Sequence, residues 1–439
     1  MPQVIVVLGV ILALAFLVFA IYKGVSPVLA SLLSVFVVIL TSGQPFQSSF
    51  NNAISMVGTI VVSVGPALIL GNMMGMIYSA SGVCLSMGKF FTIPCRKIKN
   101  PLTQKIVAIA LLILVRVVIV LSGIDATSLT IPTIGLALAI CSEYDISTRY
   151  IPAITAIVSC IGNMMPGVPG MYNLLAVQYF EGYTASSALV IRSGILILFL
   201  VVILIIFSFM AKKDMENDVH FVPSSKVPVP DIQNMKLPPW WFGLIPILVT
   251  FITYNYCGLE AWSSLSLGLA VSVVMLATYI PAKEGKSKFR TMLDELNAGS
   301  VIFPLQWFFI VLPTMAMTQT GGLDIISNGL SSLGLPAVLC LFVLALIVMG
   351  FGGSQCMPVI AGMMPMFSAA GLSSVGVALI ALWGSTVFDT LPMSAGLIMS
   401  TDLVDMPMKK SYPFAFYTTV VLTFFITILV TLLAWLGVY

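Results

Sequence analysis

Two polar residues in apolar surroundings, Asn163 and Asp389, occupy corresponding positions in two stretches that repeat each other 226 residues apart. Each stretch has a Gly/Ser-rich interruption in a hydrophobic run, followed by a second interruption that contains proline and glycine. Broken hydrophobic segments in corresponding positions of two halves indicate the binding site of a membrane transporter. Five further residues have identical partners at this spacing, namely Ser128, Pro132, Ser159, Pro166 and Gly170 with Ser354, Pro358, Ser385, Pro392 and Gly396.

The four interruptions offer the groups that would bind a small ligand. Glycine permits tight turns, while hydroxyl and amide groups supply hydrogen bonds. Proline ends a helix, and the exposed N–H groups at the start of the next half-helix attract an anion. The alternative is that these residues only kink packed helices, but two symmetric pairs of breaks favour a site. We predict that the substrate is bound by Ser122, Gly123, Thr127, Ser128, Asn163, Gly167, Gly170, Gly352, Gly353, Ser354, Gln355, Thr390 and Ser394.

Asp389 is the predicted site of proton coupling. It lies between Phe388 and Leu391, and a carboxylate inside a membrane segment is a functional hypothesis by default. Because removal from water disfavours its charged form, we predict that it exchanges a proton during transport. The alternative is a permanent cap on the half-helix that begins near Pro392. Asp125, at the first interruption, is the second proton candidate or else a turn residue.

Two arginines lie inside hydrophobic runs. Arg116 would pair with Asp125 or Glu143, or would attract an anionic substrate. Arg192 is nearer the end of its run and is expected to extend its charge to the membrane surface. The single histidine, His220, lies in a polar linker, and seven scattered cysteines are typical of apolar packing. We therefore predict no metal site and no cofactor besides the coupling ion, a proton or Na⁺.

Composition identifies a membrane protein. Hydrophobic residues make up 59% of the 439 residues and charged residues only 8%, whereas soluble domains carry about 25% charged residues. The net charge of +3 does not indicate a nucleic-acid partner. The chain has apolar runs from end to end, so we predict an all-α polytopic protein whose partner is the lipid bilayer.

Charge placement predicts how the chain crosses the membrane. All but two of the 19 Lys and Arg residues fall on one face if each half has about five transmembrane helices and one re-entrant hairpin. The second half is then an inverted copy of the first, with both termini extracytoplasmic. The predicted parts are a first repeat at 1–210 (hairpin about 105–141, broken helix about 150–180), a cytoplasmic linker at 211–239, and a second repeat at 240–439 (hairpin about 333–370, broken helix about 374–401). Loops 42–55, 181–184 and 321–332 are expected to face outward, and 83–95 to form an interfacial helix.

The motif Ser-Thr-Val-Phe-Asp-Thr-Leu-Pro at 385–392, followed by Lys-Lys-Ser-Tyr at 409–412, resembles the gluconate permease family of the ion transporter superfamily. Pro-Gly-Val-Pro-Gly at 166–170 and Gly-Gly-Ser at 352–354 are similar to its other breaks. The resemblance implies proton-coupled symport of small organic acids such as gluconate, an inner-membrane location and a homodimer built from scaffold and transport domains. It also implies that Asp389, Thr390, Ser394, Ser354 and the 166–170 break line the site.

This chain departs from that family's pattern at two places. The family often has a histidine after the first proline of each break, where this chain has Gly167 and Met393, and it has an arginine leading into the second tip, where this chain has Met349 and Phe351. The substrate could therefore differ from the family's usual acids.

The sequence predicts a secondary active transporter that carries a small organic acid with a proton by alternating access. A sodium-coupled carboxylate transporter or a cation/proton antiporter on the same fold is the alternative. We predict no enzymatic activity, because the chain has no HExxH and no GxSxG followed by a histidine.

Overall fold

The computed structural model describes residues 3–23, 25–124, 129–230, 235–283, 285–332, 334–350, 353, 356–392 and 394–439. These residues form helices and connections, without a strand among them. Helices satisfy all their backbone groups internally, which a segment in lipid requires. The first half contains α1 (Gln3–Tyr22), α2 (Pro27–Ser42), α3 (Phe46–Ala80), α4 (Val83–Phe91), the 3₁₀ turn η1 (Ile93–Lys97), α5 (Pro101–Val120), α6 (Thr130–Glu143), α7 (Tyr150–Met164), α8 (Met171–Tyr179) and α9 (Leu189–Glu216).

The second half follows the same order of long and short helices. Two helices and a long third helix are followed by a short helix, the helices of the predicted hairpin, the two helices on either side of the predicted break, and a final long helical segment. Its elements are α10 (Trp241–Asn255), α11 (Ala261–Leu276), η2 (Ala277–Tyr279), α12 (Lys288–Gln319), α13 (Gly322–Ser332), α14 (Ala337–Leu344), the π-helical turn η3 (Ala345–Met349), α16 (Met357–Gly362), α17 (Met364–Ala369), α18 (Ser374–Asp389), α19 (Ala395–Leu403), α20 (Met408–Ala415), the π-helical turn η5 (Phe416–Val421) and α21 (Leu422–Trp435).

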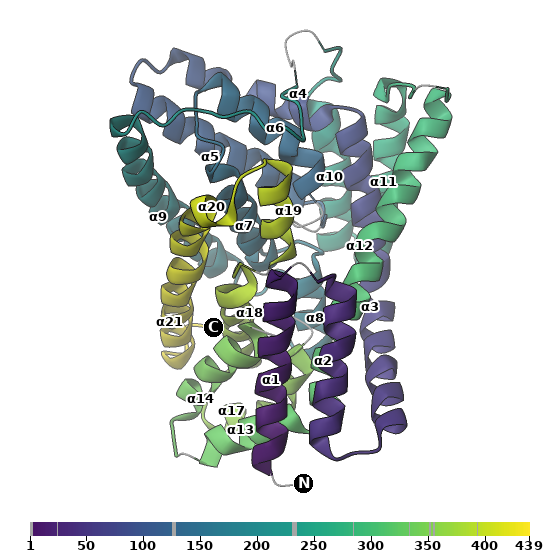
Figure 1. Cartoon of the computed structure of the whole chain (residues 1–439), viewed down its shortest axis with the longest axis vertical. Helices are drawn as coiled ribbons and strands as arrows, with labels where there is room; N and C mark the ends of the chain where they lie inside the picture. The colour runs from purple at the N-terminus through teal and green to yellow at the C-terminus, as the bar shows by residue number, and fades with distance from the viewer. Residues whose placement is uncertain are drawn as a thin grey trace.

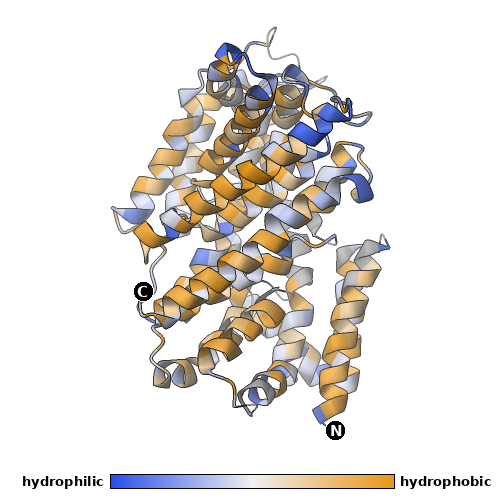
Figure 2. Cartoon of the chain, turned by 90° about the vertical axis from the view of Figure 1, so that its left-hand side faces the viewer, coloured by the Kyte–Doolittle hydropathy of each residue, from blue (hydrophilic) through white to orange (hydrophobic). Residues whose placement is uncertain are grey.

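The helices are those of a membrane protein. Four helical segments are long and apolar enough to cross a bilayer, and the bent helix α3 would make a fifth. Hydrophobic residues cover the helices along most of the molecule, while strongly hydrophilic segments gather mainly at its upper end (Figure 2). The four segments are Pro101–Val120, Leu189–Glu216, Ala261–Tyr279 and Met408–Trp435.

Each of the two segments predicted to be a broken helix contains two helices with a short interruption between them. Helix α7 has 15 residues and is about 22 Å long, which is too short to cross a bilayer, and α8 continues it after residues 165–170. Helix α18 likewise ends at Asp389, and α19 starts at Ala395. Helix α7 contacts α19 and α8 contacts α18. The two broken helices therefore run antiparallel, with their breaks side by side.

The segments of the two predicted hairpins lie at opposite ends of the molecule. Helices α5 and α6 lie in the upper part of Figure 1, and α14 and α17 lie in the lower part. The long helices α3 and α12 cross in close contact, because a Cβ on Gly299 would lie 2.8 Å from the Met73 Cα atom. Only glycine fits at such a crossing, so these two helices form one packed unit.

Three predicted segments differ from the structure. The predicted outer loop 42–55 is mostly helical, because α3 begins at Phe46, whose ring stacks on Phe36 and Phe50 at 5.0 and 5.7 Å. The predicted outer loop 321–332 contains α13. The predicted interfacial segment 83–95 contains helix α4 as expected, but α4 packs against α6 and α10 and buries four of its residues. Hydropathy alone missed α13 and the start of α3 because packing, not apolar character, decides where they form.

Candidate functional site

The first hairpin tip rests on the first break. Gly123 has φ +86°, and a Cβ at this position would lie 2.8 Å from the Pro169 Cγ atom. On its other side the tip contacts α3, where a Cβ on Gly71 would lie 3.3 Å from the Ile124 Cα atom. Glycine at both positions allows the backbones to approach each other closely. The structure thus brings together the predicted site residues Gly123 and the 166–170 break.

The second hairpin arm rests in the same way on the end of α18. A Cβ on Gly350 would lie 2.8 Å from the Phe388 Cδ2 atom, one residue before Asp389. A Cβ on Gly384 would lie 2.5 Å from the Ala345 Cβ atom of η3. Gly353, with φ +72°, is the described part of this tip.

Helices from the two halves contact each other around both breaks. Helix α6, after the first tip, contacts α19, and α16, after the second tip, contacts α8. Asn163 is buried in the last turn of α7, and Asp389 is half-buried at the end of α18. Asp389 lies within electrostatic range of the Cys160 thiol, one turn before Asn163 on α7. The amide and the carboxylate of the two repeats therefore belong to one region.

The other residues that were predicted to bind the substrate lie in different surroundings. The Ser122 hydroxyl is buried and donates to the Ile119 carbonyl at 2.7 Å. The Thr390 hydroxyl shares a hydrogen bond of 2.6 Å with that of Thr419, and Gly167 and Gly170 lie in the first break. Six predicted site residues fall outside the described residues, namely Asp125, Thr127, Ser128, Gly352, Ser354 and Gln355.

Asp389 lies at the end of one half-helix, and the N-cap position of the next belongs to Ser394. The two half-helices are α18 and α19, and Ser394 makes no side-chain cap hydrogen bond to α19. The carboxyl group therefore lies at the negative end of a helix dipole, which does not stabilise a negative charge. This position is compatible with a carboxyl group that gains and loses a proton.

Arg116 is fully buried, at 1% exposure. Its Nη1 donates to the Thr155 hydroxyl of α7 at 2.9 Å, and its Nε has no partner among the described residues. Of its two predicted partners, Asp125 lies outside the described residues. The predicted pairing with Glu143 is wrong, because Glu143 pairs with Arg96 at 3.1 Å. Within the described part of the chain, this buried cation has no carboxylate partner.

Arg192 is also fully buried, so the expectation that it extends to the membrane surface is wrong. Its guanidinium reaches inward to the first break and bonds only neutral groups. An arginine inside a hydrophobic run itself indicates that the side chain faces the interior of the helix bundle. The partners are the Met164 carbonyl (2.8 Å), the Ala185 carbonyl (2.8 Å), the Asn173 Oδ1 atom (2.9 Å) and the Tyr183 hydroxyl (3.0 Å).

Charged side chains of opposite sign meet α7 alternately along its length. Arg116 meets α7 at Thr155, Asp389 lies near Cys160, and Arg192 meets the last carbonyl of the helix. At 1.5 Å per residue, these positions are separated by about 7.5 Å and about 6 Å along the helix axis. The described residues thus place one half-buried carboxyl group between two buried guanidinium groups. Among these residues, positive charge is in excess.

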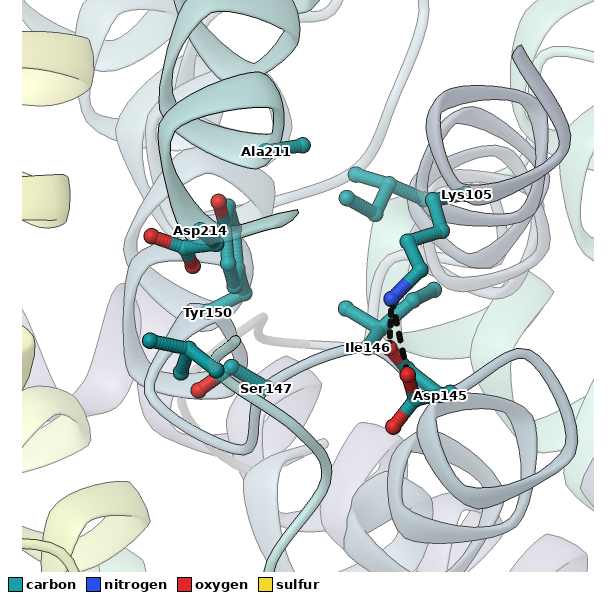
Figure 3. Close-up of a pocket in the computed structure, with 9 residues that line it drawn as sticks. Lys105, Asp145, Ile146, Ser147, Tyr150, Ala211 and Asp214 are labelled. Carbon is teal, nitrogen blue, oxygen red and sulfur yellow. Dashed lines mark hydrogen bonds and ion pairs between the residues drawn. The ribbon is translucent and has the colours of Figure 1, made fainter. Parts of the chain in front are cut away.

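A shallow pocket lies away from this region, between α5, α7 and α9. Figure 3 shows Lys105 pointing from α5 to Asp145, while Asp214 and Tyr150 lie on the opposite wall. The Lys105 Nζ atom is 3.0 Å from an Asp145 carboxylate oxygen. Arg149 pairs with Asp214 and lies over the Phe414 ring at 5.0 Å. These ion pairs fix helix ends, and none of the predicted site residues lines the pocket.

Residues 218–226 of the linker, termed the linker strap, join the two halves. On one side the Asp145 carboxylate accepts hydrogen bonds from the Phe221 N–H and the His220 ring at 3.0 and 2.9 Å. On the other side the strap contacts the end of α19 and the turn that follows. Those contacts are Ser224 to the Leu403 carbonyl (2.7 Å), Ser225 to the Asp405 carboxylate (2.6 Å) and the ion pair of Lys226 with Asp402. The start of α7 and the end of α19 therefore lie at the same end of the molecule.

We expect the linker strap to be most stable in mildly acidic solution. Burial raises the pKa of Asp145, but hydrogen bonds from Phe221, His220 and Lys105 outweigh it and lower that pKa to about 2. Hydrogen bonds to Asp145 and Asp218 raise the pKa of His220. The Asp145 contribution is thus present above pH 3.8 and is lost toward pH 2, whereas the His220 contribution is present below pH 6.5 and is lost as pH rises through its raised pKa.

The expected result is a thermal unfolding midpoint that falls on the order of a degree between pH 6 and pH 8, because the groups are exposed. His220→Gln should remove this fall and leave the midpoint at pH 8 unchanged. An identical pH slope in the variant would contradict the assignment.

No protein-family model and no curated protein matches this chain.

Proposed function

We propose that the protein is a secondary active transporter that carries a small organic acid together with a proton, as the resemblance to the gluconate permease family implies. The observation that carries this proposal is the pair of fully buried guanidinium groups beside the first broken helix. Neither Arg116 nor Arg192 has a carboxylate partner among the described residues. An uncompensated buried charge is costly, and in a membrane segment it marks a substrate or ion pathway.

The charge arrangement favours an anion over a cation as substrate. At a separation on the order of 10 Å and an effective dielectric constant of about 20, two unit charges interact by about 1.7 kcal/mol. Two arginines would each stabilise a carboxylate substrate by an energy of this order. They would repel Na⁺ by the same amount, and one Asp389 carboxylate offsets only part of that repulsion. A cation/proton antiporter is thus the less favoured alternative.

The same arrangement couples the proton to the substrate. Protonation of Asp389 removes the one negative charge that the described residues place between the arginines, so the affinity for an anion rises. Linkage requires that a bound anion raise the affinity for the proton by the same factor. The neutralised site can then move between the two faces of the membrane, as alternating access requires.

The architecture supports inverted repeats with a shared central site. The order of helices is the same in both halves, the broken helices run antiparallel, and the hairpins lie at opposite ends (Figure 1). The linker at 211–239 carries four lysines, so the positive-inside rule supports a cytoplasmic position for its end of the molecule. We further propose an inner-membrane location, extracytoplasmic termini and a homodimer in which α3 and α12 belong to the static scaffold.

The test is uptake by the purified full-length protein in proteoliposomes. Radiolabelled gluconate and a panel of sugar acids and hydroxy acids would be offered with a pH gradient, an Na⁺ gradient or no gradient. The proposal predicts accumulation of at least one acid with the pH gradient alone. Accumulation that needs Na⁺ would favour the sodium-coupled alternative. Proton flux driven by Na⁺ or K⁺ without any organic acid would overturn the proposal in favour of an antiporter.

A further inference from the structure

The end of α10 contacts the first break through the side chain of Asn255. The Asn255 Nδ2 atom donates to the Gly167 carbonyl of the break at 2.8 Å and to the Phe251 carbonyl of its own helix at 2.9 Å. The Asn255 Oδ1 atom accepts a hydrogen bond from the Ser186 hydroxyl at 3.1 Å. One amide thus joins three parts of the chain, namely α10, the first break and the loop between α8 and α9.

The backbone of the break is shaped for this contact. Gly167 is buried and has φ +75°, a left-handed conformation that favours glycine. A Cβ at this position would lie 3.2 Å from the Asn255 Oδ1 atom and 3.3 Å from the Phe251 Cε2 atom. The Gly167 N–H donates to the Ala185 carbonyl at 2.8 Å, which ties the break to the loop before α9. Glycine therefore lets the break lie directly against the end of α10.

Helix α10 is packed on the helices that we assign to the scaffold. It contacts α11, and α11 contacts α3 (Figure 1). A Cβ on Gly268 of α11 would lie 2.0 Å from the Thr250 Oγ1 atom of α10, so these two helices pack closely. The Tyr78 hydroxyl of α3 donates to the Gly243 carbonyl of α10. Packing and a hydrogen bond therefore join α10 to α3.

The first break is bound to the elements that carry the proposed site. Its Pro169 lies where a Cβ on Gly123 of the first hairpin tip would be, and Arg192 of α9 donates to the Met164 carbonyl. Alternating access requires the site to move against the scaffold, so the Asn255 contact crosses the boundary between the two parts. Its hydrogen bonds join uncharged groups, which bind less strongly than charged ones and can break and re-form in each cycle.

We propose that Asn255 is a positioning residue that holds the first break against α10 in this conformation, and that the contact separates when the site moves to the other face of the membrane. The separation rests on the proposed transport function, whereas the positioning does not. The two parts are therefore tested by different measurements.

Hydrogen exchange measured by mass spectrometry on the full-length protein tests the positioning without any substrate. Asn255→Leu keeps a branched side chain but removes all three hydrogen bonds, so peptides over 165–170 and 183–187 should exchange about tenfold faster. The matched control is Asn217→Leu. The Asn217 amide makes the same bond to the carbonyl four residues earlier, that of Lys213, at 2.7 Å at the end of α9. This control should leave exchange at 165–170 unchanged.

Should Asn255→Leu fail to fold, a milder variant keeps the positioning testable. Ser186→Ala removes the one bond to the exposed loop residue and should give a smaller acceleration over 183–187. Exchange equal to that of the wild type in Asn255→Leu, or in Ser186→Ala where only that variant folds, would overturn the inference.

A reversible cross-link tests whether the contact separates. Ser186→Cys and Asn255→Cys together place two thiols where the hydroxyl and the amide oxygen lie 3.1 Å apart, and Cys257→Ser removes an exposed cysteine nearby. A short bifunctional methanethiosulfonate would join the two thiols. Counterflow of the acid found in the uptake panel should then fall at least about 20-fold and return after reduction. The single-cysteine variants should be unaffected by the reagent.

The outcomes separate this inference from the transport proposal. Unchanged counterflow in the cross-linked protein would overturn the inference, because the contact would then stay closed throughout the cycle, and would leave the transport proposal intact. Uptake of no acid by the wild type would overturn the transport proposal and the separation with it. The exchange measurement would still decide whether Asn255 positions the break.

Discussion

Replacement of Asp389 by asparagine is expected to reduce accumulation driven by a pH gradient at least about 100-fold. Asparagine has nearly the shape of a protonated aspartate but cannot release a proton, so the site would stay in the form that binds the anion. Exchange of labelled for unlabelled acid across the membrane should continue, because it needs no net proton movement. The measurement is uptake into proteoliposomes with and without a pH gradient, alongside counterflow in the absence of a gradient.

The matched control is Asp324→Asn, the same change at an exposed carboxylate in the first turn of α13. It should leave accumulation and counterflow within about twofold of the wild type. Loss of counterflow together with accumulation in Asp389→Asn would point to a structural or ligand role for this carboxyl group. Full accumulation in that variant would show that the proton is carried elsewhere, with Asp125 as the next candidate.

The positions of the breaks could be predicted from the sequence because their cause is local. Pro166 and Pro392 cannot continue a helix, and glycine tolerates the unwound backbone, so α7 ends at Met164 and α18 at Asp389. The sequence predicted that tips and breaks share one site, because they recur as symmetric pairs in the two halves. The pairing of Gly123 with Pro169 required coordinates, because a one-dimensional pattern does not show which glycine meets which backbone.

The polar network of the first break could not be predicted, because it depends on contacts between separate helices. Hydropathy placed Arg192 near the end of an apolar run, yet α9 packs so that the side chain faces inward. The contacts of the linker could not be predicted for the same reason, although its polar composition indicated a cytoplasmic connection. The bond of Lys226 to Asp402 joins residues 176 positions apart, and only the fold brings them together.

Replacement of Arg116 by glutamine is expected to raise KM for the transported acid about tenfold while leaving the thermal unfolding midpoint unchanged or raised. The first effect follows from the loss of one buried positive charge that attracts the anion. The second follows because a buried charge without a carboxylate partner destabilises the fold, so its removal is neutral or favourable. Thr155 would not be left unsatisfied, because its hydroxyl also donates to the Ile151 carbonyl at 3.0 Å.

Arg149→Gln provides the matched contrast, since it makes the same chemical change at an arginine that has a carboxylate partner. This substitution leaves the mostly buried Asp214 carboxylate without its ion pair, which should lower stability by about 1–3 kcal/mol at this partly buried site. KM should change little, because Arg149 lies at the start of α7, far from the break. Arg116→Lys should retain most of the affinity, since it keeps the charge. A fall in the unfolding midpoint of Arg116→Gln equal to that of Arg149→Gln, with KM unchanged, would show that Arg116 is a structural residue and would remove the electrostatic argument for an anionic substrate.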